Sequence, residues 1–76
     1  MKALVVDDTS YIRQDIREIL ERNGYEVIEA ENGAEAVEFY KEQRPDIVTM
    51  DINMPKIHGL RATQMITNYD PNAKII

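Results

Sequence analysis

Short apolar runs alternate along the chain with longer segments in which apolar residues recur at helical spacing. Residues 3–6 and residues 47–50 are two such runs, and a continuous apolar run is typical of a strand covered on both faces. Residues 25–30 mix apolar residues with two glutamates, which predicts a half-exposed strand at a sheet edge. Residues 73–76 predict the start of a fourth strand. Two of the four strand segments therefore suit the centre of a sheet.

Three amphipathic segments lie between these strands. The first covers residues 9–23 and ends at Asn23-Gly24, a typical helix stop. The second opens with Asn32 and Glu35, which form a capping-box pair, and ends before Pro45, since the residue preceding a proline is disfavoured in the α region. The apolar residues at helical spacing are Ile12, Ile16, Ile19 and Leu20 in the first segment, Ala36, Val37 and Tyr40 in the second, and Ala62, Met65, Ile66 and Tyr69 in the third.

This order of elements, βαβαβαβ, predicts an α/β fold with a mostly parallel sheet and right-handed crossovers. The two apolar strands belong at the centre and the polar second strand at an edge. We therefore expect the partial strand order 2-1-3-4, which is flavodoxin-like.

Composition and charge exclude several classes of function. With 76 residues, the chain has room for one domain. Its net charge of −5 argues against binding to nucleic acid or to an anionic membrane surface. The absence of cysteine excludes disulfides and Cys-based zinc sites. No segment is apolar for the length of a membrane span, and residues 1–6 are too short for a signal peptide, so we expect a cytoplasmic protein.

Three acidic residues stand where two central strands end. Asp7 and Asp8 directly follow the first strand, and Asp51 directly follows the third. In a flavodoxin-like sheet these carboxyl ends are neighbours at the point where the strand order reverses, which is where ligands bind. Clustered carboxylates repel one another unless a cation joins them, and hard oxygen ligands favour magnesium, calcium or manganese. The topology thus predicts a site for a divalent cation, best suited to Mg²⁺ and phosphate oxygens.

A plainer interpretation applies to each acid taken singly. Acids at strand ends are often solvated loop residues, and Asp8 would then only cap the first helix, where the helix dipole favours negative charge. His58 and the methionines offer no chemistry beyond this, and we assign them no functional role.

Four motifs follow one another along the chain. They are Val5-Val6-Asp7-Asp8, then Asn32-Gly33-Ala34-Glu35-Ala36, then residues 45–55, Pro-Asp-Ile-Val-Thr-Met-Asp-Ile-Asn-Met-Pro, and then Gly59. With these motifs the sequence resembles the receiver domain of two-component response regulators, particularly the single-domain chemotaxis type. The resemblance covers the whole chain, and the motifs fall in the family's order. In this family Met54-Pro55 and Gly59 would shape the loop beyond Asp51.

The resemblance implies a role for four residues. Asp51 would be the phosphoacceptor, a nucleophile that takes a phosphoryl group from the phosphohistidine of a histidine kinase. Asp8 would bind Mg²⁺ directly, Asp7 through water, and Asn53 through its backbone carbonyl. Phosphoryl transfer asks the protein mainly for in-line positioning and charge neutralisation, and the metal supplies much of both. The implied function is two-component phosphorelay signalling, and the chain would not be an enzyme.

The resemblance also implies that residues 1–76 are the N-terminal two-thirds of a receiver domain. A whole receiver has a fifth strand, and it carries a Thr or Ser after the fourth strand and a Lys after the fifth, which contact the phosphoryl group. Neither position exists in this sequence, so we expect phosphotransfer to be impaired. The fourth-strand edge would be exposed, and an exposed edge with apolar faces favours a dimer or higher homo-oligomer.

Two interpretations of function therefore remain open. One is a receiver module active in phosphorelay. The other is a truncated or engineered receiver fragment that self-associates as a structural unit without phosphotransfer. A phosphatase with an aspartate nucleophile is excluded, because it needs a second acid two positions after the first and Asp7 is followed by Asp8 and Thr9. A P-loop is excluded because no glycine-rich loop with a lysine follows the first strand.

Overall fold

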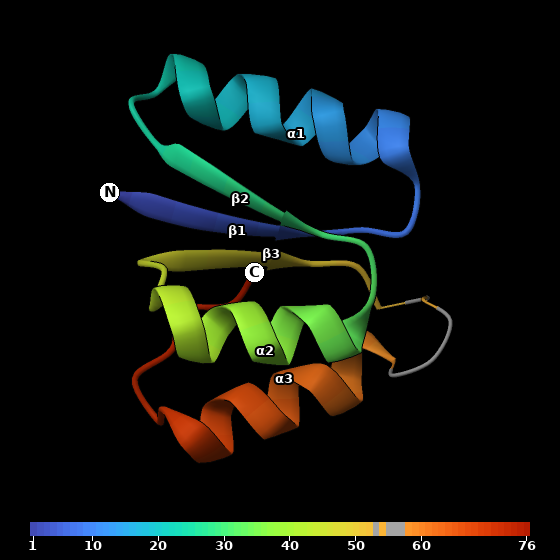
Figure 1. The fold of residues 1–76 in the computed structure, drawn as a ribbon, viewed down its shortest axis with the longest axis vertical. Helices are drawn as coiled ribbons and strands as arrows, with labels where there is room; N and C mark the ends of the chain where they lie inside the picture. The colour runs from blue at the N-terminus through green and yellow to red at the C-terminus, as the bar shows by residue number, and fades with distance from the viewer. Residues whose placement is uncertain (53, 55–57) are drawn as a thin grey trace.

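The computed structural model describes residues 1–52, 54 and 58–76 of the chain. Within them, three parallel strands form one sheet in the order β2-β1-β3 (Figure 1). The strands are β1 Lys2–Val6, β2 Glu26–Ala30 and β3 Ile47–Met50. The predicted flavodoxin-like α/β architecture is confirmed, with the apolar strand β1 at the centre and the glutamate-bearing strand β2 at an edge.

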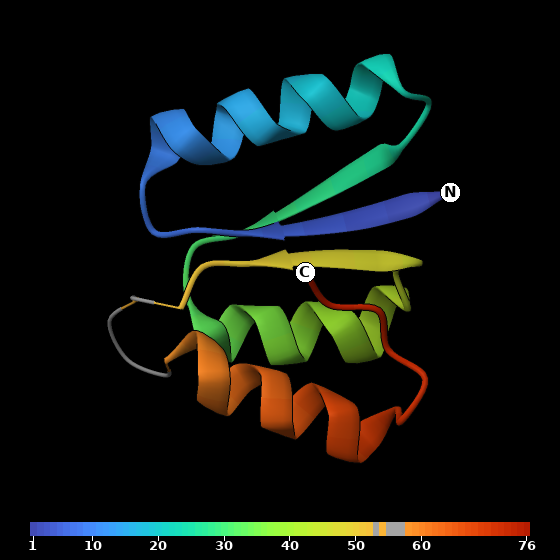
Figure 2. The same cartoon turned by 180° about the vertical axis from the view of Figure 1, so that it is seen from behind.

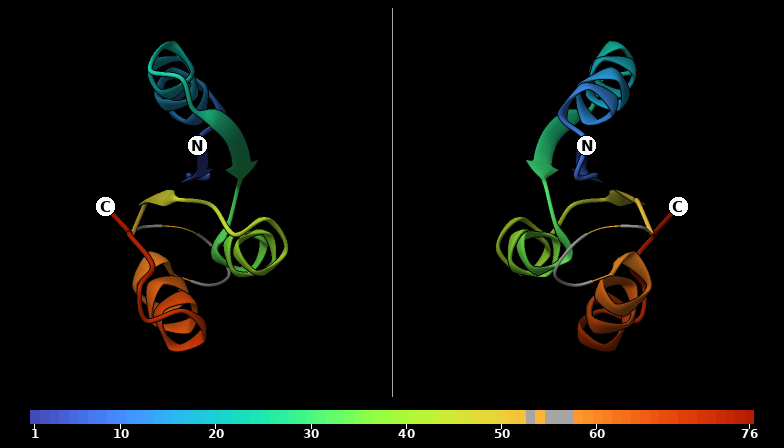
Figure 3. Two further views of the ribbon diagram at one scale, coloured as in Figure 1. Left: turned by 90° about the vertical axis from the view of Figure 1, so that its left-hand side faces the viewer. Right: turned by 90° about the vertical axis from the view of Figure 1, so that its right-hand side faces the viewer.

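Helices cover the two faces of this sheet unequally. They are α1 Ser10–Arg22, α2 Gly33–Gln43 and α3 Gly59–Tyr69. When the molecule is viewed along the strands, α1 lies on one face of the sheet, and α2 and α3 lie together on the other face (Figure 3). The main core forms on the side of α2 and α3, where the buried side chains are Leu4, Val6, Ala30, Ala36, Val37, Tyr40, Val48, Met54, Ala62 and Ile66.

The α1 side is less covered than its sequence pattern predicted. No residue of α1 is fully buried, and both Ile12 and Ile19 of the expected apolar stripe are exposed. Ala3 and Val5 of β1 are nevertheless fully buried. The helix thus shields the sheet, while part of its own apolar stripe faces solvent because no other described element packs on that side.

The expectation of a fourth strand was wrong in detail. Residues 73–76 form an isolated parallel bridge between Ile75 and Val48 instead of a strand. Val48 N–H donates to the Lys74 carbonyl at 2.9 Å, and Ile76 N–H donates back to the Val48 carbonyl at 2.9 Å. Figure 2 shows this segment running beside β3, which is the predicted place. A strand requires consecutive bridges, and this short segment makes only one of them.

The ends of α2 follow from identifiable residues. The Asn32 side chain accepts a hydrogen bond from Glu35 N–H at 2.9 Å, as the capping-box prediction requires. The Glu35 carboxylate accepts from Glu31 N–H at 2.9 Å, one residue before the position expected in a standard capping box. The helix ends at Gln43, and Arg44 before Pro45 takes a left-handed conformation with φ of 48°.

Candidate functional site

Asp7, Asp8 and Asp51 meet at the carboxyl end of the sheet. One carboxylate oxygen from each lies within 4.8 Å of the others. The neighbouring strands cause this convergence, because Val6 of β1 lies opposite Met50 of β3 and Asp51 N–H donates to the Val6 carbonyl at 3.0 Å. The structure therefore brings the three predicted acids together, in an arrangement whose oxygen donors suit a hard divalent cation.

The three acids differ in their surroundings. Asp7 is buried, Asp51 is half-buried and Asp8 is exposed. The Asp7 carboxylate accepts a hydrogen bond from Thr9 N–H at 2.9 Å, and Asp7 N–H donates to the Ala30 carbonyl of β2 at 3.1 Å. Thr9, and not Asp8, is the N-cap residue of α1, and its side chain makes no capping hydrogen bond. Asp8 therefore lacks the capping role that the plainer interpretation gave it.

Gly59 fixes the backbone that follows Asp51. Its N–H donates to the Ile52 carbonyl at 3.1 Å. A Cβ atom at Gly59 would lie 2.1 Å from the Asp51 carbonyl oxygen and 2.7 Å from the Cα of Ile52. The glycine thus allows the start of α3 to contact the backbone at the candidate phosphoacceptor.

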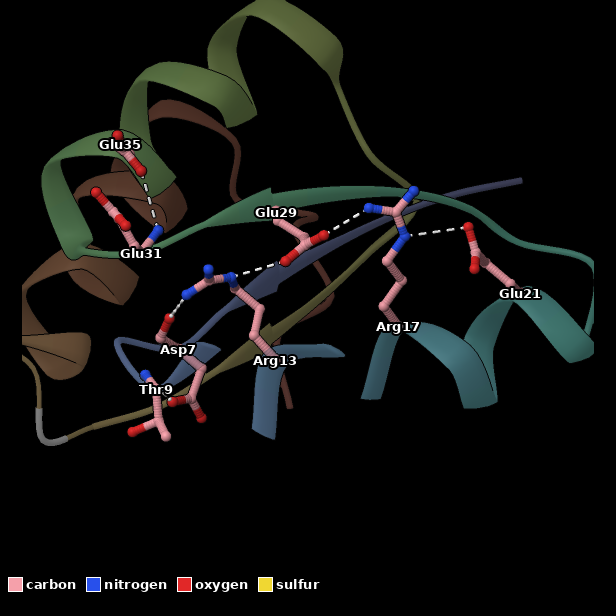
Figure 4. A network of polar contacts seen from close by, with 8 residues as sticks. All are labelled: Asp7, Thr9, Arg13, Arg17, Glu21, Glu29, Glu31 and Glu35. Atoms are coloured by element: carbon pink, nitrogen blue, oxygen red, sulfur yellow. Dashed lines mark hydrogen bonds and ion pairs between the residues drawn. The ribbon is translucent and has the colours of Figure 1, made fainter. Parts of the chain in front are cut away.

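A polar network of α1 and β2 reaches the acids from one side (Figure 4). Arg13 donates from Nη1 to the Asp7 carbonyl at 2.7 Å and from Nε to the Glu29 carboxylate at 2.8 Å. The hydrogen bond from Arg17 to Glu29, followed by the one from Arg13, holds the pKa of the Glu29 carboxyl below its ordinary value. Sequence reasoning missed these residues, because the glutamates of β2 were interpreted only as a sign of edge exposure.

A small hollow of about 170 Å³ adjoins two of the acids, Asp7 and Asp51, on the α1 side of the sheet. Ile16 and Ile76 form apolar parts of its wall, and Thr49 of β3 also lines it. The Thr49 hydroxyl is buried and has no hydrogen-bond partner within the described part of the chain.

Of the other residues that the sequence analysis named, some lie outside the described residues and some lie within them. Asn53 and Pro55 lie outside the described residues, so the structure places neither the backbone carbonyl expected to bind metal nor the expected loop proline. Met54 is buried in the main core. His58 is exposed at the N-cap position of α3 and makes no side-chain capping hydrogen bond.

Comparison with known families decides the classification of the chain. The family model of the response regulator receiver domain matches residues 3–76. The chain belongs to this family. The match extends over the three strands, the three helices and the acidic cluster of this receiver, which accords with the resemblance found in the sequence.

Known relatives are longer than this receiver chain. The chemotaxis protein CheY of Thermotoga maritima is 54% identical over 76 residues, which are 99% of this chain and 63% of that protein. The solved structure of the response regulator TrrA of the same organism, in complex with Mg²⁺ and BeF, superposes with a TM-score of 0.94 at 42% identity and covers 97% of this chain and 64% of that one. TrrA in complex with the histidine kinase ThkA superposes with a TM-score of 0.91 at 42% identity, again over 97% and 64% of the two chains. The chain thus spans less than two-thirds of these relatives.

Proposed function

We propose that this receiver accepts a phosphoryl group on Asp51 in a two-component phosphorelay, with Mg²⁺ held by Asp7, Asp8 and Asp51. The observation that carries the proposal is the convergence of the three carboxylates within 4.8 Å at the carboxyl end of the sheet. Asn53 completes the proposed ligand set through its backbone carbonyl. When bound, the cation would neutralise charge on the phosphoryl oxygens and on the surrounding acids.

In the proposed phosphoryl transfer, Asp51 would be the nucleophile, and Asp7 and Asp8 would hold the cation. One oxygen of the Asp51 carboxylate forms a bond to phosphorus, while the bond from phosphorus to the histidine nitrogen of the donor breaks and its electron pair stays on that nitrogen. Asp7 and Asp8 would supply negative charge that holds the cation in the acidic site. The complex between the similar regulator TrrA and the kinase ThkA supports a histidine kinase as the phosphodonor.

The experiment is a calorimetric titration of the 76-residue chain with Mg²⁺ and then with beryllofluoride, which stands in for the phosphoryl group. We expect the wild type to bind both. Asp51→Ala should lose beryllofluoride binding, and Asp8→Asn should weaken Mg²⁺ binding by at least about tenfold, the loss often seen even for supporting residues of metal sites. Asp15→Asn is the matched control, because it removes one negative charge from an exposed position on α1. A wild type that binds neither ligand would refute the proposal.

The second interpretation, a self-associating fragment without phosphotransfer, is not favoured by the family match. We retain self-association as part of the proposal for the 76-residue polypeptide, through the edge beside β3. Three further expectations stay predictions: that residues 1–76 are the N-terminal two-thirds of a receiver domain, that the chain is a signalling module and not an enzyme, and that it is cytoplasmic. No helix among the described residues has the length and apolar character needed to cross a membrane.

A further inference from the structure

One peptide group joins two of the three acids in the candidate site. Its carbonyl belongs to Asp7 and its N–H belongs to Asp8, so the plane of this peptide sets how the two side chains diverge. The Asp7 carbonyl accepts a hydrogen bond from Arg13 Nη1 at 2.7 Å. Figure 4 shows the Arg13 side chain reaching from α1 to this point. The guanidinium of Arg13, which comes from α1, therefore holds the main chain between Asp7 and Asp8.

Arg13 is itself held in place. Its Nε donates to the Glu29 carboxylate of β2 at 2.8 Å, and its side chain is only 15% exposed. A guanidinium presents its donors in a rigid planar fork, so fixing Nε on Glu29 also fixes the direction of Nη1. Contacts therefore run from Glu29 of the edge strand β2, through Arg13 of α1, to the peptide group between Asp7 and Asp8.

A neighbouring arginine provides an internal comparison. Arg17 donates from Nη1 to the second carboxylate oxygen of Glu29 at 2.5 Å and from Nε to Glu21 at 3.1 Å. Its side chain is 42% exposed, and neither of these contacts reaches the acidic site. Arg17 shares the helix, the charge and the Glu29 partner with Arg13, but not the bond to the Asp7 carbonyl.

We propose that Arg13 is a positioning residue for the acidic site, which orients Asp7 and Asp8 by holding the peptide group between them. The inference rests on the proposed function, because it concerns the binding of a divalent cation by the same acids. It goes beyond that function by assigning a role to a residue that does not contact the reacting atoms. Glu29 accepts a hydrogen bond from Arg13 Nε and so acts on the acidic site only through Arg13.

A purely structural role for Arg13 would be to attach α1 to the sheet. Unfolding measurements detect that role, whereas Mg²⁺ affinity and the NMR signals of the Asp7–Asp8 peptide detect the positioning role. The Asp7 carbonyl ¹³C and the Asp8 amide ¹⁵N report the hydrogen bond directly and need no metal. Arg13→Gln removes the charged fork, Arg13→Lys keeps the charge without the fork, and Arg17→Gln is the matched control.

The experiment measures Mg²⁺ affinity by calorimetry, unfolding by urea and the two NMR signals for the wild type and all three variants. We expect Arg13→Gln and Arg13→Lys to weaken Mg²⁺ binding by about 10- to 100-fold, the range for groups that orient metal ligands. Both should shift the Asp7 carbonyl and Asp8 amide signals. Arg17→Gln should leave affinity within about twofold and leave both signals in place. If Arg13→Gln does not fold, Arg13→Lys gives the same comparison.

Two outcomes would overturn the inference in distinguishable ways. If the wild type binds Mg²⁺ and the folded Arg13 variants bind it equally well, the positioning role is refuted and the proposed function stands. If the wild type does not bind Mg²⁺, both are refuted. An equal loss of affinity in Arg13→Gln and Arg17→Gln would also refute the role, because it would reflect a disturbance of α1 and Glu29 that both arginines share. Loss of positive charge near the acids would by itself strengthen Mg²⁺ binding.

Discussion

At the scale of single residues, two glycines serve different physical needs. Gly24 follows α1 with φ of +86°, a conformation that side chains with a Cβ rarely adopt, and it has open space around it. Gly59 is constrained by space, because a Cβ there would meet the backbone of Asp51 and Ile52. The first glycine is required by the turn, and the second by the close approach of α3 to the candidate site.

Gly59→Ala should destabilise the fold by at least about 1–3 kcal/mol, the usual cost of overpacking, because a backbone carbonyl cannot move aside as a side chain can. The free energy of unfolding in urea measures this. At an unhindered interior helical position alanine is favoured over glycine by up to about 1 kcal/mol. A loss of stability in Gly59→Ala therefore indicates crowding, whereas a gain would indicate only the better helix propensity of alanine. Gly24→Asn is the control and should cost about 1 kcal/mol or less, since asparagine tolerates the left-handed region. A Gly59→Ala variant more stable than the wild type would contradict the crowding argument.

The acids of the site could be predicted from sequence, whereas their supporting residues could not. Asp7 and Asp51 follow apolar strands, and the rules of parallel sheets bring such strand ends together. Arg13 differs because its partner is a main-chain carbonyl, and every residue offers one. No sequence pattern tells which carbonyl a guanidinium will reach, so this contact required the rotation of α1 about its axis to be known.

At the scale of elements, α2 and the end of α3 are joined by one tyrosine. The Tyr40 hydroxyl donates to the Asp70 carboxylate at 2.7 Å. Its ring packs edge-to-face on Tyr69, with centroids 6.5 Å apart and an interplanar angle of 89°. Burial, followed by the hydrogen bond to Asp70, raises the pKa of Tyr40 to about 12. A buried hydroxyl with one charged acceptor therefore links the two helices.

Tyr40→Phe should lower the free energy of unfolding by about 1 kcal/mol at neutral pH, the net value of one hydrogen bond. The folded state retains the Tyr40 proton more tightly than the unfolded state, whose tyrosine pKa is about 10. The stabilisation that the protonated Tyr40 hydroxyl gives the folded state is therefore complete below pH 10 and is lost as the pH rises toward 12. The stability difference between wild type and variant should therefore shrink over that range in urea unfolding. A difference that is constant to pH 12 would mean that the hydroxyl does not titrate as described.

The order of the elements was predictable because local patterns and sheet rules agree for β1, β2 and β3. The limits of individual elements depended on tertiary contacts. Residues 73–76 have a strand-like sequence, but their pairing with β3 stops at one bridge. Ile12 and Ile19 have helix-core spacing, but their burial depends on what packs over α1, and periodicity along one helix cannot supply that.

At the scale of the whole molecule, exposed apolar side chains gather beside β3. Ile52, Leu60 and Ile76 are exposed, and Leu60 and Ile76 line a largely apolar hollow of about 270 Å³ together with Met50 and Ile75. This surface adjoins residues 74–76, which pair with β3 through a single bridge. An apolar surface at the edge of a sheet favours contact with a second chain.

We therefore expect the 76-residue polypeptide to form a dimer or higher homo-oligomer at tens of micromolar, as measured by light scattering. Leu60→Lys should shift the population toward the monomer, because Leu60 is 66% exposed and lies beside the β3 edge. Ile19→Lys is the control, since Ile19 is 56% exposed but belongs to α1 on the other face of the sheet. A monomeric wild type would contradict the expectation, and equal effects of the two variants would place the contact elsewhere.

The central position of β1 has a consequence for how the chain is made. Lys2 N–H donates to the Asp46 carboxylate 44 positions along the chain, and the next residue of β1 pairs with the first of β3. A ribosome adds about 5–20 residues per second, so β1 and the first two acids emerge seconds before β3 is available. Pairings this distant in sequence are also slow to form. Because Asp51 arrives with β3, the acidic cluster is assembled in the same event that completes the sheet, and a half-synthesised chain has no such cluster with which to capture a cation.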